Sequence, residues 1–195
     1  MARAAGPGPR ERLLHAASEL FYREGVGAVG VDRISERAGV SKRTLYQQFA
    51  SKDDLVAASL RRAGPGILSA YLGAAERCAA PRTRILAVFE GLMTWSGSDG
   101  FRGCPFVNAA TELADPAHPA RAVARESKLH MQSFFKEQAR LGGSPDPASL
   151  AIQLMIVFDG AMIQSVVHSR VVPETVRAAV EALLDAGGVS QAAGA

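Results

Sequence analysis

The sequence is poor in the features that mark several specialised classes of protein. Its 195 residues include two cysteines, Cys78 and Cys104, which are too few for a disulfide framework or a four-cysteine zinc site. No uninterrupted apolar run reaches about 18 residues, which argues against a transmembrane helix. No apolar stretch follows the first arginines, which argues against a secretory signal. We therefore expect a cytoplasmic protein that makes no membrane contact.

Excess charge of either sign is also scarce, since the formal net charge is +3. Apolar residues make up 48% of the chain and charged residues 21%, as is usual for soluble globular proteins and unlike disordered or collagen-like chains. The small excess is unevenly distributed. Residues 1–62 hold 11 Lys/Arg against 7 Asp/Glu, whereas residues 63–195 hold 11 against 12. This asymmetry suggests a basic N-terminal module on a near-neutral body.

Alternating strand patterns are absent as well, and apolar residues recur instead at the three-to-four-residue spacing of helix faces. The pattern predicts an all-α protein with about nine helices. Gly64-Pro65-Gly66 either ends the fourth helix or kinks a longer one, and Gly25 is placed to close the first helix in a left-handed cap. The expected helices are 10–24, 31–38, 41–48, from 51 to the Gly-Pro-Gly cluster, 67–77, 81–95, 104–113, 121–141, 148–167 and from 173.

The first three helices form the pattern of a helix-turn-helix. Gly39 permits the sharp turn before the third helix, and Ser41 is placed to cap that helix. Leu45 and Phe49 lie one turn apart, which predicts that they face the core. The side chains left outward are polar or basic and none is acidic, as expected of a helix that serves phosphates and base edges in the major groove: Ser41, Lys42, Arg43, Thr44, Tyr46, Gln47 and Gln48.

The stretch Arg10–Leu60 resembles the DNA-binding domain of TetR-family transcriptional regulators. The resemblance is carried by ISERAGVSKRTLYQQF at residues 34–49 and by SKDDL at residues 51–55. A weaker resemblance, to one branch of the family, covers GCPFVNAA at residues 103–110, Glu112 and Asp115-Pro116. The family implies a ligand-responsive regulator, usually a repressor, that binds a palindromic operator in double-stranded DNA as a homodimer and is released by a small-molecule effector.

The resemblance also implies roles for individual residues. Ser41, Thr44, Tyr46 and Lys52 match positions that hold phosphates, whereas Lys42, Arg43 and Gln47 match positions that reach base edges. The sequence departs from the family at Gly30 and Gln48, where a Thr and an aromatic residue are common, and Arg43 replaces a common Gly. The full set of expected DNA-binding residues is Arg33, Ser41, Lys42, Arg43, Thr44, Tyr46, Gln47, Gln48 and Lys52.

We expect three parts in the chain: a flexible arm over residues 1–9, the DNA-binding domain over 10–62, and a ligand-binding and dimerisation domain over 63–195. The helix at 148–167 has more apolar surface than a body of this size can cover, which favours self-association. The resemblance places the dimer interface in about 148–167 and 173–186. Bulky apolar residues with a few polar anchors are typical of ligand pockets, and the candidates are Phe89, Met93, Trp95, Phe106, Asn108, His130, Phe134 and Met155.

Competing interpretations are weaker. The motif G-x-G-x-x-G at residues 25–30 follows a helix rather than a strand, so we interpret it as a loop and not as a dinucleotide site. Cys104 is expected to be a buried structural thiol, and surface or pocket positions are expected for His118 and His130. Asp159, inside an apolar helix, must be paired, exposed or at an interface.

Other classes of function remain as alternatives. They are a small α-helical enzyme and a non-specific DNA-binding protein. No catalytic residue, cofactor or metal site is expected.

Overall fold

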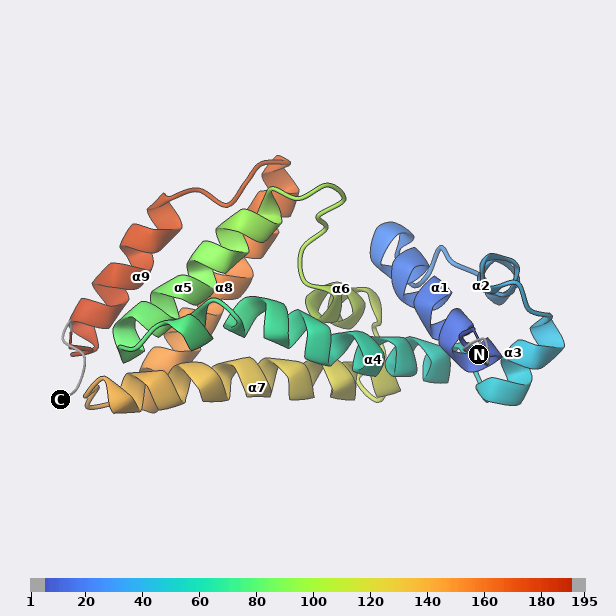
Figure 1. Cartoon of the computed structure of the whole chain (residues 1–195), viewed down its shortest axis with the longest axis horizontal. Coiled ribbons are helices and arrows are strands. Elements are labelled where there is room, and N and C mark those ends of the chain that lie inside the picture. Colours follow the sequence, from blue (N-terminus) through green and yellow to red (C-terminus); the bar gives the residue numbers. More distant parts are fainter. Residues whose placement is uncertain (1–5, 191–195) are drawn as a thin grey trace, which may run out of the picture. The chain divides into compact units, whose positions relative to one another are not determined.

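The computed structural model describes residues 6–190, which fold into nine α-helices and one short 3-10 helix, with no strand among them (Figure 1). This confirms the all-α prediction. Residues 1–5 of the predicted flexible arm lie outside the described residues, and the first helix already begins at Pro9. The α-helices are α1 Pro9–Glu24, α2 Val31–Ala38, α3 Lys42–Gln48, α4 Lys52–Leu72, α5 Pro81–Ser96, α6 Pro105–Glu112, α7 Pro119–Leu141, α8 Pro147–His168 and α9 Thr175–Ala186.

The chain divides into two compact units. Among the described residues, the first unit, which we call the head, comprises residues 6–65 and 105–126, and the second, the body, comprises residues 66–104 and 127–190. The domain boundary at residue 62 remains a prediction. The contacts, however, group residues 105–126 with the N-terminal unit, whereas the sequence analysis places them in the C-terminal domain. The physical reason is a set of long-range polar contacts, made by Glu112 and His118, that no local pattern reveals.

The head is built around α1, which packs against both α2 and α3. Leu13, Ala17 and Leu20 lie on the inward face of α1 and are buried, as their helical spacing predicts. They join Ile34 of α2 and Leu45 of α3 in one apolar cluster. The helix-turn-helix therefore has a core of its own, which fixes the orientation of α3 on α1 and α2.

Local signals set the ends of the head helices. The Ser41 hydroxyl accepts a hydrogen bond from the Thr44 amide at 3.0 Å, and Ser51 does the same for Asp54 at 3.0 Å, so both predicted caps are confirmed. Gly39 closes α2 in the left-handed conformation, with φ 63° and ψ 40°. Gly25 ends α1 with φ 92° but ψ 157°, so the predicted left-handed cap is wrong at that position. The backbone there leaves the helix in an extended direction and opens the turn toward α2.

Helix α4 continues through the Gly64-Pro65-Gly66 cluster to Leu72, so of the two alternatives the longer helix is the one observed. Proline within a helix removes one backbone hydrogen bond and crowds the preceding turn. The flanking glycines carry no Cβ, and a Cβ at Gly66 would meet no atom within 4 Å. The predicted helix at 67–77 is replaced by the end of α4 and by a 3-10 helix at Ala75–Arg77.

In the body, α5, α8 and α9 lie side by side, and each packs against the other two (Figure 1). The Arg82 guanidinium, only 6% exposed, pairs with Asp185 at 2.7 Å and donates to the Val189 carbonyl at 3.2 Å. A buried cation that has both an anionic partner and a carbonyl acceptor avoids most of the cost of desolvation. This ion pair links the start of α5 to the end of α9.

Helix α8 is the most apolar helix described, and by length and composition it is the one described helix that could cross a membrane. Asp159 interrupts the apolar sequence of this helix, so the chain has no uninterrupted apolar run of that length. Only 39% of its most apolar window is buried, because one face packs in the body while the other remains exposed. A core helix with one uncovered apolar face meets the same criterion.

Candidate nucleic-acid interface

Helix α3 presents the face that the sequence predicts. Leu45 is fully buried and Phe49 is 5% exposed, so both point into the head and hold the helix in place. Tyr46 is 48% exposed, although the large ring of a tyrosine is usually mostly buried. The other outward side chains are polar and none is acidic, namely Ser41, Lys42, Arg43, Thr44, Gln47 and Gln48.

Two expected contact residues have partners within the head. The Lys42 ammonium lies 2.9 Å from the Asp32 carboxylate on α2, and this hydrogen bond raises the pKa of Lys42. Arg33 pairs with Glu24, which lies at the end of α1. Both pairs are largely exposed, so solvent screens them and they contribute little to stability. A DNA phosphate could therefore replace either carboxylate as the partner of the cation at little cost in stability.

Arg43 differs from these two residues. It is exposed and makes no hydrogen bond or ion pair with any residue that the structure describes. Its guanidinium has five donors in a planar fork, which suits bidentate contact with guanine or phosphate. Arg43 is therefore the cation on α3 whose donors need not be released from another partner before DNA binds.

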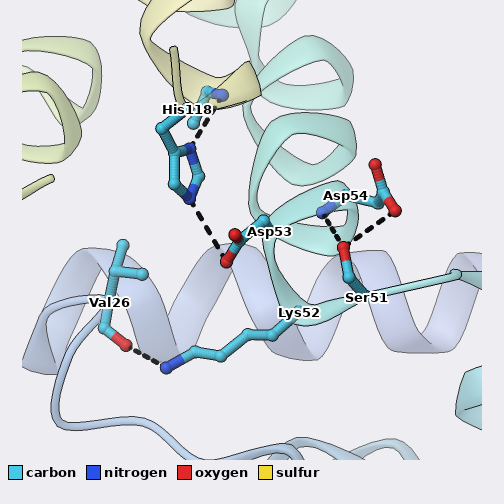
Figure 2. Close-up of polar contacts among 7 residues, drawn as sticks. Val26, Ser51, Lys52, Asp53, Asp54 and His118 are labelled. Carbon is cyan, nitrogen blue, oxygen red and sulfur yellow. Dashed lines mark hydrogen bonds and ion pairs between the residues drawn. The ribbon is translucent and has the colours of Figure 1, made fainter. Parts of the chain in front are cut away.

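Lys52, the first residue of α4, reaches back to the α1–α2 turn. Its ammonium donates to the Val26 carbonyl at 2.6 Å (Figure 2). The family resemblance implies that Lys52 contacts a DNA phosphate, and the structure shows that its ammonium also has an acceptor within the chain. A phosphate contact would have to share or replace this bond.

Arg10, near the start of α1, is a further basic residue of the head that no sequence motif distinguishes. Its guanidinium carbon lies 5.1 Å from the centre of the Phe49 ring, within the range of a cation–π contact. Arg10 thus lies beside the residue that ends α3. Only its positive charge in the basic N-terminal third could have indicated it from sequence.

Arg37 on α2 forms an ion pair with Glu19 on α1. Its guanidinium donates to both carboxylate oxygens, at 2.8 and 3.0 Å, and this hydrogen bond holds the pKa of Glu19 below its ordinary value of 4.5. A carboxyl whose pKa is lower in the folded state contributes stability above its unfolded pKa and loses it as the pH falls through the folded pKa. The pair therefore stabilises the head at neutral pH and ceases to do so in acid.

We expect Glu19→Gln to flatten the pH dependence of head stability below about pH 4.5, because the variant has no carboxyl to protonate there. Urea unfolding at a series of pH values measures this difference. The matched control is Glu36→Gln, which removes an exposed carboxylate of α2 that makes no hydrogen bond with a described residue. An equal flattening in both variants would show that the Arg37 contact is not the cause.

The expected ligand-binding residues are divided between the units. Phe106 and Asn108 belong to the head, and the other six belong to the body. Within the body, Trp95 and Phe89 join one chain of aromatic rings through Tyr71 and Phe158, with ring centres 5.1 to 5.7 Å apart. Phe89 is 1% exposed, so it is part of the body core. The other four body candidates are the buried Met155, the half-buried Met93 and Phe134, and the exposed His130.

Asp159 and the histidines have distinct environments. Asp159 of α8 pairs with Lys128 of α7, so the paired alternative is the one observed. His118 is 8% exposed and its imidazole is buried at the start of α7, so of the two expected positions the surface one is not observed. Cys104 is 3% exposed and carries a free thiol, as the structural interpretation predicts. Among residues 6–190, no cluster of three or more potential metal ligands is found.

The sequence and fold are similar to those of known transcriptional regulators. The family model described as "Bacterial regulatory proteins, tetR family" matches residues 13–59. A TetR-type transcriptional regulator from Streptomyces avermitilis superposes with a TM-score of 0.89 and 41% identity, over 94% of this chain and 100% of that one. SCO4454, a TetR-family transcriptional regulator from Streptomyces coelicolor, gives 0.84 and 34%, over 92% and 96%.

A curated relative resembles part of the chain. The transcriptional activator FasR of Mycolicibacterium smegmatis is 40% identical over 95 residues, which cover 48% of this chain and 43% of FasR. The match thus spans less than half the length of that relative. The likeness in fold and sequence to the two Streptomyces structures, in contrast, extends over nearly the whole chain.

Proposed function

The chain belongs to the TetR family of bacterial regulatory proteins, a family of DNA-binding transcriptional regulators that are not enzymes, and from this premise we propose that it binds a palindromic operator as a homodimer and leaves it when a small-molecule effector binds. The observation that carries the proposal is the outward face of α3, which combines Arg43 and Gln47 with no acidic side chain. Such a face meets the negative phosphates without repulsion and offers donors for base edges.

We assign the contacts on α3 and at the start of α4 by chemistry. The hydroxyls of Ser41, Thr44 and Tyr46 and the ammonium of Lys52 would hold phosphates, which fixes the register of α3 in the major groove. Lys42, Arg43 and Gln47 would read base edges. Arg33 and Gln48 complete the proposed interface at its margins. The exposure of all these side chains except the half-buried Thr44 and Lys52 supports the assignment.

A row of exposed apolar side chains on α8 supports the homodimer. Ile152, Ile156, Ile163 and Val167 are 48 to 67% exposed, and their spacing places them on one helix face. Gly160 lies between them, and a Cβ there would meet no atom within 4 Å. We call these four residues the α8 stripe. A two-fold axis that pairs two copies of the stripe would cover it, with α9 alongside, and would present two α3 helices about one DNA turn apart.

We place the effector site in the body. The aromatic rings and Met155 of the body provide apolar lining. The expected ligand-binding roles of Phe106 and Asn108, which belong to the head, stay predictions. An effector that prefers the spacing of the two heads unsuited to DNA would lower operator affinity by the ratio of its affinities for the two states. A thermal-shift screen of small molecules tests the site, because a bound effector raises the unfolding temperature by mass action.

We propose that the chain represses its target, which the family resemblance favours. FasR, an activator by name, represents the opposite mode. A reporter gene placed downstream of the operator separates the two modes, since repression requires expression to rise when this chain is deleted. We expect the chain to act in the cytoplasm.

We expect Arg43→Ala to weaken operator binding by about tenfold to a hundredfold and to relax base preference at the position that Arg43 contacts, since a bidentate Arg–guanine pair is worth about 1 to 3 kcal/mol. The probe is the best site selected in vitro from random-sequence duplexes, and fluorescence anisotropy measures the affinity. Random-sequence DNA in excess serves as competitor.

The control for this variant is Arg61→Ala, which removes an equal charge from an exposed position on α4, away from the proposed base contacts. If Arg43→Ala keeps the base preference of the wild type, the assignment of Arg43 is wrong. If random DNA displaces the wild-type chain as readily as the selected site does, the chain is a non-specific DNA-binding protein and the proposed function fails.

A further inference from the structure

The turn between α1 and α2 is bound by one carboxylate from a distant part of the chain. The Glu112 side chain, at the end of α6, accepts hydrogen bonds from the Val26 amide at 2.8 Å and from the Gly27 amide at 2.6 Å. Hydrogen bonds to an ionised acceptor are about twice as strong as those between neutral groups. The two N–H groups thus form a small nest that one anionic side chain fills.

The glycines of this turn allow the carboxylate to come close. A Cβ at either Gly25 or Gly27 would lie 3.1 Å from the nearer Glu112 oxygen, which is tighter than ordinary contact. Gly25 also has φ +92°, a conformation that side chains disfavour. The G-x-G-x-x-G stretch at residues 25–30, which resembles a dinucleotide fingerprint, therefore binds the Glu112 carboxylate of the same chain and not a nucleotide phosphate.

The same turn is linked to the far end of the helix-turn-helix. Lys52 donates to the carbonyl of Val26 at 2.6 Å, so the Val26 residue is held at its amide by Glu112 and at its carbonyl by Lys52. Lys52 is the first residue of α4 and follows α3 after a short connection. The sequence from the turn to α4, which contains α2 and α3, is thereby closed into a loop whose two ends meet.

A second contact, between His118 and Asp53, lies beside the hydrogen bond from Lys52 to Val26. The buried imidazole of His118 accepts the Ala120 amide at Nδ1 (3.1 Å), so in the neutral ring the proton is on Nε2, which faces Asp53 at 3.3 Å (Figure 2). Asp53 stands next to Lys52 in the first turn of α4. Arg121 fixes the segment itself, because it donates to the carbonyls of Ala110 and Leu113 at 3.1 and 2.8 Å.

From these contacts we infer that Glu112 is a positioning residue for operator binding: it holds the α1–α2 turn, and through Val26 and Lys52 it fixes the start of α4 and the orientation of α3. This role rests on the proposed operator binding and adds to it a residue that does not touch DNA. This positioning role predicts a change in DNA affinity opposite to the change expected from charge alone. Removing an acidic side chain from a DNA-binding head should strengthen binding if charge alone matters, whereas loss of a positioning residue should weaken it.

The test measures binding of the full-length chain to the selected operator by fluorescence anisotropy. We expect Glu112→Ala to weaken binding by about tenfold, as the loss of two charge-assisted hydrogen bonds implies, and Glu112→Gln to fall between Glu112→Ala and the wild type, since its amide oxygen can accept one of the two bonds. The matched control is Glu126→Gln, which removes an equal charge from an exposed side chain of α7 without a hydrogen bond or ion pair to a described residue.

Two further readouts separate positioning from general loss of structure. The slope of log affinity against log salt should stay at the wild-type value in Glu112→Ala, because no phosphate contact is removed, whereas one lost contact lowers it by about 0.9. The amide proton resonances of Val26 and Gly27 should move upfield in the variant, because both N–H groups lose the carboxylate acceptor.

Binding by Glu112→Ala that equals or exceeds that of the wild type, as expected for Glu126→Gln, overturns the inference while leaving the proposed function intact. A wild-type chain without preference for the selected site overturns the proposed function instead. If Glu112→Ala fails to fold, Glu112→Gln decides: unchanged amide resonances at Val26 and Gly27 or unchanged affinity would each refute the role.

Discussion

An Ile156→Glu variant is expected to be a monomer at micromolar concentration and to bind the selected operator about a hundredfold more weakly than the wild type. Ile156 is 66% exposed in the single chain and lies in the middle of the α8 stripe. In a two-fold dimer each substitution occurs twice, so two carboxylates would be buried close to each other without partners. The loss of dimerisation separates the two α3 helices and forfeits the gain from binding both half-sites at once.

Analytical ultracentrifugation measures the oligomeric state, and anisotropy measures the affinity. Leu129→Glu is the matched control, because Leu129 is a large apolar residue of similar exposure, 54%, on α7 and lies outside the stripe. We expect this control to remain dimeric and to bind normally. A dimeric Ile156→Glu variant with wild-type affinity would exclude the α8 stripe as the interface.

A Leu45→Ala variant is expected to lose about 2 to 5 kcal/mol of stability in the head and with it nearly all specific DNA binding. Leu45 is fully buried and is the residue of α3 that enters the head core. α3 has seven residues, too few to be helical in water on its own, so its structure depends on this packing. The body should keep its helices, since its core contains no residue of α3.

Hydrogen exchange resolved along the chain measures this selective loss, because it reports the stability of α3 separately from that of α5 and α8. Gln48→Ala serves as control on the same helix. Gln48 is exposed, so its removal should leave exchange unchanged while weakening DNA binding slightly. Uniform destabilisation of the whole chain by Leu45→Ala would contradict an independent head core.

Features determined by neighbouring residues were predictable from sequence. The caps at Ser41 and Ser51 depend on a hydroxyl and an amide three residues later, and the burial of Leu45 and Phe49 follows from helical spacing. The outward face of α3 is then whatever remains. The part of the proposed DNA-binding surface that lies on α3 therefore follows from the sequence residue by residue, whereas the role of Lys52 follows only from the family resemblance.

Features that depend on distant residues were not predictable. The partners of Glu112 lie 85 and 86 positions away in the chain, and the partner of Asp159 lies 31 positions away. Neither local propensity nor hydrophobic period encodes such pairs. At Pro65 the local pattern left two alternatives open, and the structure shows that α4 continues through the proline.

The contact between Glu112 and the α1–α2 turn has a consequence for engineering. A DNA-binding module cut from this chain at residue 62 or 65 would lose the acceptor of the Val26 and Gly27 amides, together with the histidine beside Asp53. A chimeric regulator that grafts this head onto a foreign sensor therefore needs two segments, not one. The graft must include residues 105–126, or the sensor must supply a carboxylate where Glu112 now stands.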